Sequence, residues 1–351
     1  INHYMAINYE RNAEIETDFY EAVKETFGQQ AFVGTHPTWF PFPNSSELFK
    51  NGLSWWNSKR DLAQVDEATP FAVRTALAKK WNSPVWYNMF YDPDVKTYVR
   101  ELWPAVLGGG RLNIHQPFPV QMETLDASIS LLKGDLFAAV QRIQLLDYIS
   151  ASPVNSPVAV VFGHPAASNW ANGELFADVG LDVTNRLWEK GIYADLIPST
   201  EIVNGSLTVN AHGKVQYGPQ QYEAVVYYHP EFDYPEVERF FDRAAHAGTS
   251  VLYRVGDKEV DFYGKPVRAK RKGGRVVGVE EAVNGVLDAL KSVEGTVQTL
   301  GEIRGLASFP ASVMPHASGH IRLLDGTYII ASGERQLMGD TIQRQLKVDG
   351  Q

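Results

Sequence analysis

The 351-residue chain contains no cysteine, so disulfide bonds, thiolate metal sites and a cysteine nucleophile are excluded. It has no apolar run near the roughly 20 residues that a membrane-spanning helix needs, and its first residues, INHYMAINYERNAE, lack a signal-peptide pattern. We therefore expect a soluble protein with no membrane partner. The compartment stays open, with the cytoplasm favoured over secretion, because a disulfide-free protein can function on either side of a membrane.

Basic residues are also in short supply. The formal net charge is −9 and the sequence pI is about 5.5, whereas nucleic-acid binders concentrate lysine and arginine. One basic cluster, RAKRKGGR at residues 268–275, contains two glycines and is flanked by acidic segments, which is typical of a solvated loop or hairpin. We expect no nucleic-acid partner.

Aromatic residues are plentiful, at 12% of the chain with eight tryptophans and sixteen tyrosines. One interpretation is packing in the core and at interfaces. The other is sugar binding, because the C–H faces of a pyranose ring stack well on flat aromatic side chains. The sequence leaves both interpretations open.

The first 119 residues alternate between strand-like and helix-like segments. A spacing of four between Ile15, Phe19, Val23 and Phe27 predicts a first helix. Strand-like runs follow at residues 29–39, 61–71, 83–93 and 110–119, with helical patterns between them. This alternation predicts a parallel sheet, either the late part of a barrel or an open sheet.

The rest of the chain divides into three further parts. Residues 120–156 read as a connecting helix and linker, and residues 157–296 as a second unit of alternating strands and helices. Ligand sites in open parallel sheets lie beyond the carboxyl ends of strands, here near His164, Ser199 and His229. Residues 297–351 read as the start of a small β domain, with a hairpin turn at Asp325 and Gly326.

Several segments resemble the distal half of the family 42 β-galactosidases and their barrel relatives. They are VAVVFGHPAASNW (158–170), LWEKGIYADLIPSTEI (187–202), YEAVVYYHPEF (222–232) and LLDGTYIIASG (323–333), preceded by SWWNSKRDLAQVDEATPF and VWYNMFY, which are similar to late barrel strands. The resemblance implies an α/β chain: the last strands of a (β/α)₈ barrel, then a flavodoxin-like doubly wound domain of the class-I-amidotransferase type, then a small β domain. It also implies a homo-oligomer formed through the second domain, and a chain that is part of a longer polypeptide.

The resemblance implies a glycoside hydrolase of the β-galactosidase type that acts on oligosaccharides at the barrel mouth. Such barrels carry a general acid after the fourth strand and a nucleophilic glutamate after the seventh. If VWYNMFY is the seventh strand, Asn88 stands at its polar end in place of that glutamate. This departure keeps a second hypothesis open, in which the chain is a non-catalytic carbohydrate-binding or scaffold protein derived from such a hydrolase.

Catalytic groups of parallel barrels project from the carboxyl ends of strands. Asp66 and Glu67 are the adjacent carboxyl pair at such an end, and glycoside hydrolysis needs two carboxyl groups, so one of them is the expected catalytic or sugar-binding acid. The alternative is that Asp66 caps the helix that follows it.

Other polar and aromatic residues near strand ends are predicted to bind the carbohydrate. They are His36, Trp39, Asn88, Tyr91, His115 and Gln116, together with Trp55 and Trp56 in the loop NGLSWWNS. We expect no metal, because no HxH or HExxH spacing is present. We also expect no other cofactor: glutaminase chemistry needs a cysteine, and GHPAASNW offers no phosphate-binding loop for a flavin.

Overall fold

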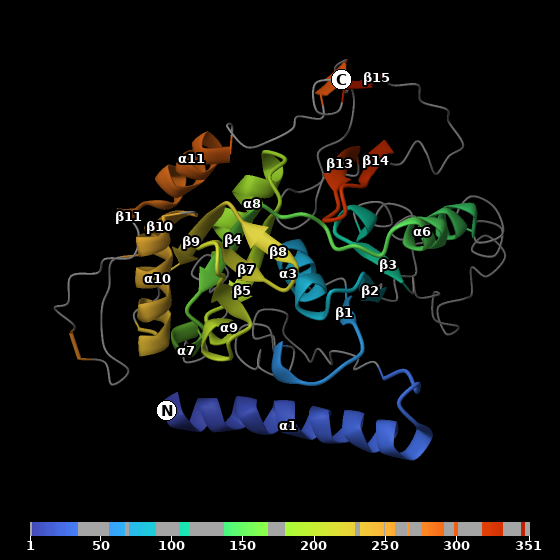
Figure 1. Cartoon of the computed structure of the whole chain (residues 1–351), viewed down its shortest axis with the longest axis horizontal. Coiled ribbons are helices and arrows are strands. Elements are labelled where there is room, and N and C mark those ends of the chain that lie inside the picture. The colour runs from blue at the N-terminus through green and yellow to red at the C-terminus, as the bar shows by residue number, and fades with distance from the viewer. Residues whose placement is uncertain are drawn as a thin grey trace, which may run out of the picture.

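The computed structural model is a mixed α/β protein with two parallel sheets (Figure 1). It describes residues 2–33, 56–66, 70–88, 105–112, 137–167, 180–228, 232–248, 250–256, 265–266, 275–290, 298–300, 318–332 and 345–347. Within these residues, no helix is long and apolar enough to cross a bilayer.

A long first helix, α1 (Asn2–Phe27), lies along one side of the molecule, at the bottom of Figure 1. Its second half is fixed by Asp61, which accepts hydrogen bonds from Tyr20 Oη at 3.0 Å and Lys24 Nζ at 2.9 Å. The helix predicted over residues 15–27 is therefore confirmed. Ile15, Phe19 and Phe27 are exposed, however, and the inward face carries Ala13 and Lys24.

The first sheet contains three parallel strands in the order β1-β2-β3, namely β1 (Ala63–Asp66), β2 (Val85–Asn88) and β3 (Gly110–Leu112). Helix α3 (Phe71–Trp81) connects β1 to β2. It ends at Asn82, which takes the left-handed conformation at φ 45° that commonly closes a helix. These strands lie inside three of the predicted strand-like runs.

The second sheet contains five parallel strands in the order β11-β10-β9-β4-β5. If these strands are numbered along the chain and the sheet is read from the β5 edge, the spatial order is second, first, third, fourth and fifth. Every residue of the two strands β4 and β5 is buried, as expected for a parallel sheet covered on both faces. The strands are β4 (Val158–Phe162), β5 (Ala194–Pro198), β9 (Ala224–Tyr228), β10 (Val251–Val255) and β11 (Arg275–Val277).

Three helices of good length pack on the second sheet: α8 (Leu181–Glu189), α10 (Pro235–Ala247) and α11 (Val279–Leu290). Helices α8 and α11 contact each other, and α8 also contacts β5. Pro235 begins α10, where its missing N–H costs no hydrogen bond, and Gly248 ends it with a φ of 67°. All three helices lie within the region 157–296, for which the sequence predicts alternating strands and helices.

Short elements complete the described chain. A small antiparallel sheet, β6 (Leu207–Val209), β7 (Val215–Tyr217) and β8 (Gln220–Tyr222), follows β5 and precedes β9 along the chain, and it was not predicted. The hairpin β13 (Ser318–Arg322) and β14 (Tyr328–Ser332) turns at Gly326 as predicted. The remaining elements are α6 (Phe137–Ile149), α7 (His164–Ala167), α9 (Thr200–Val203), β12 (Gln298–Leu300) and β15 (Gln345–Lys347).

Helix α3 joins the two sheets, because it packs against β5 although it belongs to the first sheet in chain order. Asp195 of β5 accepts hydrogen bonds from Thr75 Oγ1 at 2.6 Å and from Lys79 Nζ at 2.7 Å, and all three residues are buried. A few residues away, Lys80 Nζ forms an ion pair with the buried Glu201 at 2.8 Å. The two sheets therefore share one core across a polar seam.

The backbones on the two sides of the seam also approach each other closely. Gly218, between β7 and β8, has a φ of 52°, and a Cβ atom placed on it would lie 2.2 Å from the carbonyl oxygen of Lys79. Only glycine fits such an approach without displacing α3.

Candidate functional site

The first sheet brings two predicted site residues to one edge. Strands β1 and β2 are parallel, and Asp66 is the register partner of Asn88 at their carboxyl ends. Catalytic groups of parallel α/β folds project from this edge. The backbone thus places a carboxylate-bearing and an amide-bearing residue at neighbouring positions of this edge.

The alternative role of Asp66 as a helix cap is wrong. Helix α3 begins at Phe71, its N-cap is Pro70, and no side chain caps it. The position that a capping side chain would occupy is taken by Pro70, so Asp66 is not the N-cap residue of α3. A capping role therefore no longer accounts for the acid at the end of β1.

The other predicted residues of this rim fall outside the described part of the chain. They are Glu67, His36, Trp39, Trp55, Tyr91, His115 and Gln116. Their roles remain predictions.

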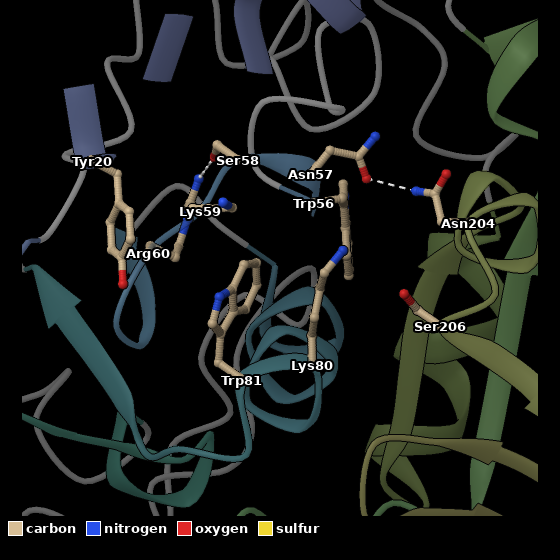
Figure 2. Close-up of a pocket in the computed structure, with 10 residues that line it drawn as sticks. All are labelled: Tyr20, Trp56, Asn57, Ser58, Lys59, Arg60, Lys80, Trp81, Asn204 and Ser206. Carbon is tan, nitrogen blue, oxygen red and sulfur yellow. Dashed lines mark hydrogen bonds between the residues drawn. The ribbon is translucent and has the colours of Figure 1, made fainter. Parts of the chain in front are cut away.

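Trp56 is described, and it lies away from this edge. It precedes the amino end of β1, whereas Asp66 stands at the carboxyl end of the strand. The side chain is 1% exposed and belongs to the main core cluster. It also forms part of the wall of a pocket of about 480 Å³ (Figure 2).

Four segments build this pocket, which we call the junction pocket (Figure 2). Helix α1 supplies Tyr20, and α3 supplies Lys80 and Trp81 from its last turn. The residues 56–60 line it from the chain before β1, and Asn204 and Ser206 from the connection between α9 and β6. Both first-sheet contributions come from the amino ends of β1 and β2, so the junction pocket and the Asp66–Asn88 edge lie at opposite ends of these strands.

A third group of polar residues lies beyond the carboxyl ends of strands in the second sheet. Ser199 Oγ donates a hydrogen bond to Asp233 Oδ1 at 2.9 Å and accepts one from the backbone N–H of His164 at 3.1 Å. Tyr227 Oη donates to the second oxygen of Asp233 at 2.8 Å. The sequence pointed to His164 and Ser199 but missed Asp233, and His229 lies outside the described residues.

Burial sets the protonation of this third group. Desolvation raises the pKa of Asp233 to about 7, against the opposing effect of the hydrogen bonds from Tyr227, the amide of Tyr234 and Ser199. Desolvation also lowers the pKa of the buried His164 to about 4, so that the imidazole is neutral at pH 7. Ser199 and Tyr227 donate side-chain hydrogen bonds to Asp233, and Tyr234 donates from its backbone amide. These bonds link the segments that follow β5 and β9, so the group has a structural role.

No residues of the described chain gather as a metal site, since no group of three or more histidine or carboxylate side chains comes together there.

No protein-family model matches the chain, and no curated protein matches it either. Among solved structures, the crystal structure of apo exo-carrageenase GH42 from Bacteroides ovatus is similar to this chain, with a TM-score of 0.54 and 13% sequence identity. The match covers 98% of this chain and 55% of the carrageenase, so this chain spans about half the length of that protein. At this identity the likeness establishes a shared α/β fold.

Proposed function

We propose that the chain is part of a glycoside hydrolase whose active site lies at the carboxyl ends of β1 and β2. The observation that carries the proposal is the register pairing of Asp66 with Asn88 at that edge. The similarity of nearly the whole chain to part of a GH42 exo-carrageenase adds support, because the two proteins share a fold and the other is a carrageenase.

In this proposal the first 119 residues are late strands of a (β/α)₈ barrel, and residues 120–156 are the connection that follows. Strands β1, β2 and β3 are parallel and neighbour each other in the order in which they occur along the chain, and α3 connects the first two. This arrangement supports the assignment. Residues 157–296 form a flavodoxin-like, amidotransferase-like domain, supported by a strand order of second, first, third, fourth and fifth. Residues 297–351 begin a small β domain that includes the β13–β14 hairpin.

The reaction needs two carboxyl groups across the scissile bond. Asp66 or Glu67 supplies one of them in our proposal. Asn88 donates from its amide to a sugar hydroxyl, and His36, Trp39, Trp55, Tyr91, His115 and Gln116 complete the carbohydrate contacts. Trp56, predicted with them, is buried at the other end of the sheet and takes no part at this edge. The substrate is an oligosaccharide of the β-galactoside type, and the protein is a homo-oligomer through its second domain.

A second candidate function is carbohydrate binding without cleavage. It is favoured by Asn88, which ends β2 where the resemblance leads us to expect a nucleophilic glutamate. An amide binds sugar hydroxyls but cannot attack an anomeric carbon.

A panel of nitrophenyl glycosides distinguishes the two functions. We expect the full-length protein to release nitrophenol from at least one β-glycoside, and Glu67→Gln to reduce kcat by about a hundredfold or more if Glu67 acts as acid, base or nucleophile. Asp182→Asn, on the exposed surface of α8, is the matched control. Equal turnover by Glu67→Gln and the parent removes Glu67 from the mechanism. No turnover on any glycoside, with measurable binding of the same sugars, favours the binding protein.

A further inference from the structure

The junction pocket carries positive charge in a chain that is negative as a whole. The formal net charge is −9, yet Lys59, Arg60 and Lys80 line the pocket, and none of the described residues that line it is a carboxylate. A pocket wall of this kind raises the local concentration of anions and orients them. Its charge is therefore a property of this site and does not follow from the composition of the chain.

Each of these cations is held by a carboxylate that does not line the pocket. Lys59 pairs with Glu21, Arg60 with Glu16 at 3.4 Å, and Lys80 with the buried Glu201 at 2.8 Å. Tyr217 Oη also donates to Glu201, at 2.7 Å. The carboxylates fix the cations and offset much of their charge, so a free inorganic anion gains little here. A ligand needs further contacts to bind well.

Aromatic rings supply those contacts. The half-buried rings of Trp81 and Tyr20 line the same space from two different segments, and Trp56 borders it but is only 1% exposed (Figure 2). The guanidinium carbon of Arg60 lies 5.2 Å from the centroid of Trp81, and Lys80 Nζ lies 5.4 Å from it, so cations and ring meet at one place. A pyranose that bears an anionic group presents both an apolar C–H face and a negative charge, and it matches this pairing.

Polar groups complete the wall. Asn204 Nδ2 donates to Asn57 Oδ1 at 2.7 Å across the pocket, which joins the α9–β6 connection to the segment before β1 (Figure 2).

From these observations we propose that the junction pocket binds an acidic sugar unit, namely a pyranose carrying a carboxylate or sulfate group. The site lies at the end of the first sheet opposite the Asp66–Asn88 edge, so it holds a part of the glycan that is not being cleaved. The choice of a saccharide rests on the proposed function, whereas the choice of an anionic one rests on the lining of the pocket. The volume of about 480 Å³ falls within the range of small-molecule sites.

Titration calorimetry on the full-length protein with both Asp66→Asn and Glu67→Gln tests this proposal without interference from hydrolysis. The probes are a galacturonate trisaccharide, a sulfated galactose trisaccharide, a neutral galactose trisaccharide and sodium sulfate. We expect one of the two acidic trisaccharides to bind at least about tenfold more tightly than the neutral one, and comparison of these two identifies the anionic group. Lys59→Gln should weaken that binding about three- to fivefold, because Lys59 is an exposed cation with a screened charge.

Lys190→Gln is the matched control, since Lys190 is an exposed lysine at the end of α8 and does not line the pocket. It should leave binding unchanged. Lys59→Gln changes an exposed side chain and is expected to fold, so a loss of binding is not a loss of structure. Trp81→Ala should weaken the acidic and neutral sugars alike.

Four results overturn the proposal. The first is equal binding of neutral and acidic trisaccharides, and the second is sulfate binding as tight as that of the sulfated sugar, which means an adventitious ion only. The third is an equal effect of Lys59→Gln and Lys190→Gln on binding, and the fourth is no binding by any probe. Binding at the junction pocket without cleavage of any glycoside by the parent protein would refute only the proposed hydrolase. Cleavage without binding at the pocket would refute only this inference.

Discussion

The acidic residues near the two parallel sheets differ in where they lie. Around the second sheet, Asp195 of β5, Glu201 of α9 and Asp233 after β9 all accept hydrogen bonds from described neighbours, and the first two are fully buried. In the first sheet, Asp66 ends β1 as the register partner of Asn88 at the end of β2. A buried acid surrounded by donors has a structural task, whereas the carboxyl ends of parallel strands are where ligand sites of such folds lie. Under the proposed function, the second sheet therefore contributes stability and the first sheet carries the carbohydrate chemistry.

The polar seam shows how the second sheet supports the first. Asp195 accepts from Lys79 and Thr75 of α3 and from Tyr222 Oη of β8 at 2.7 Å. Lys79 Nζ also donates to Ser156 Oγ at 2.7 Å. Because α3 is the helix between β1 and β2, these bonds fix the orientation of the strands that carry Asp66 and Asn88.

The largest expected effect comes from breaking this seam. Asp195→Asn leaves the buried Lys79 ammonium without its counter-charge, and we expect the free energy of unfolding to fall by about 3–5 kcal/mol at pH 7. Burial already lowers the pKa of Lys79 to about 8, so the loss should shrink as the pH rises toward 10 and the amine becomes neutral. Urea unfolding at pH 7 and pH 10 measures both values.

The matched control is the double variant Lys79→Met with Asp195→Leu, which removes both charges. It should be clearly more stable than Asp195→Asn alone, because replacing both partners leaves no uncompensated charge. A loss below about 1 kcal/mol for Asp195→Asn would show that the seam does not hold the sheets together.

A smaller effect is expected from the pH dependence of the second sheet. The pKa of Asp233 is raised by burial to about 7, so the folded state binds more protons than the unfolded state between about pH 4 and pH 7, and this group destabilises the fold as pH rises. The pKa of His164 is lowered to about 4, so the unfolded state binds more protons between about pH 4 and pH 6.5, and this group stabilises the fold as pH rises. The two contributions oppose each other.

Single variants separate them. Relative to the parent, Asp233→Asn should gain roughly 4 kcal/mol of stability between pH 4 and pH 7, and His164→Gln should lose roughly 3 kcal/mol. Thermal unfolding curves at these two pH values give the differences. Parallel changes of the same sign in both variants would contradict the assignment of opposite roles.

The fold could be predicted from the sequence wherever apolar spacing was strong. β1, β2 and β3 all lie within predicted runs, and the alternation of strands and helices expected over residues 157–296 is found in β4, β5, β9 and β10 with α8, α10 and α11. The antiparallel strands β6–β8 were missed because LTV, VQY and QQY are three residues long and too short to show a period of two.

The site was partly readable. Placing Asp66 and Asn88 at strand ends followed from local pattern, but their pairing required the register of two strands. The ion pair of Lys79 with Asp195 joins residues 116 positions apart, and Lys79 looked like an ordinary solvated lysine in ALAKKW. Asp233 gave no signal either, because its role depends on Ser199 and Tyr227, which converge only in the fold.

The most direct test of the account compares two carboxylate replacements in the same glycosidase assay. We expect the double variant Asp66→Asn with Glu67→Gln to reduce kcat by about a hundredfold or more with an unchanged Tm, and Asp233→Asn to shift the pH dependence of Tm while kcat stays within about threefold of the parent. The reverse pattern, with activity lost on replacing Asp233 and retained in the double variant, would place the chemistry in the second sheet and contradict the account.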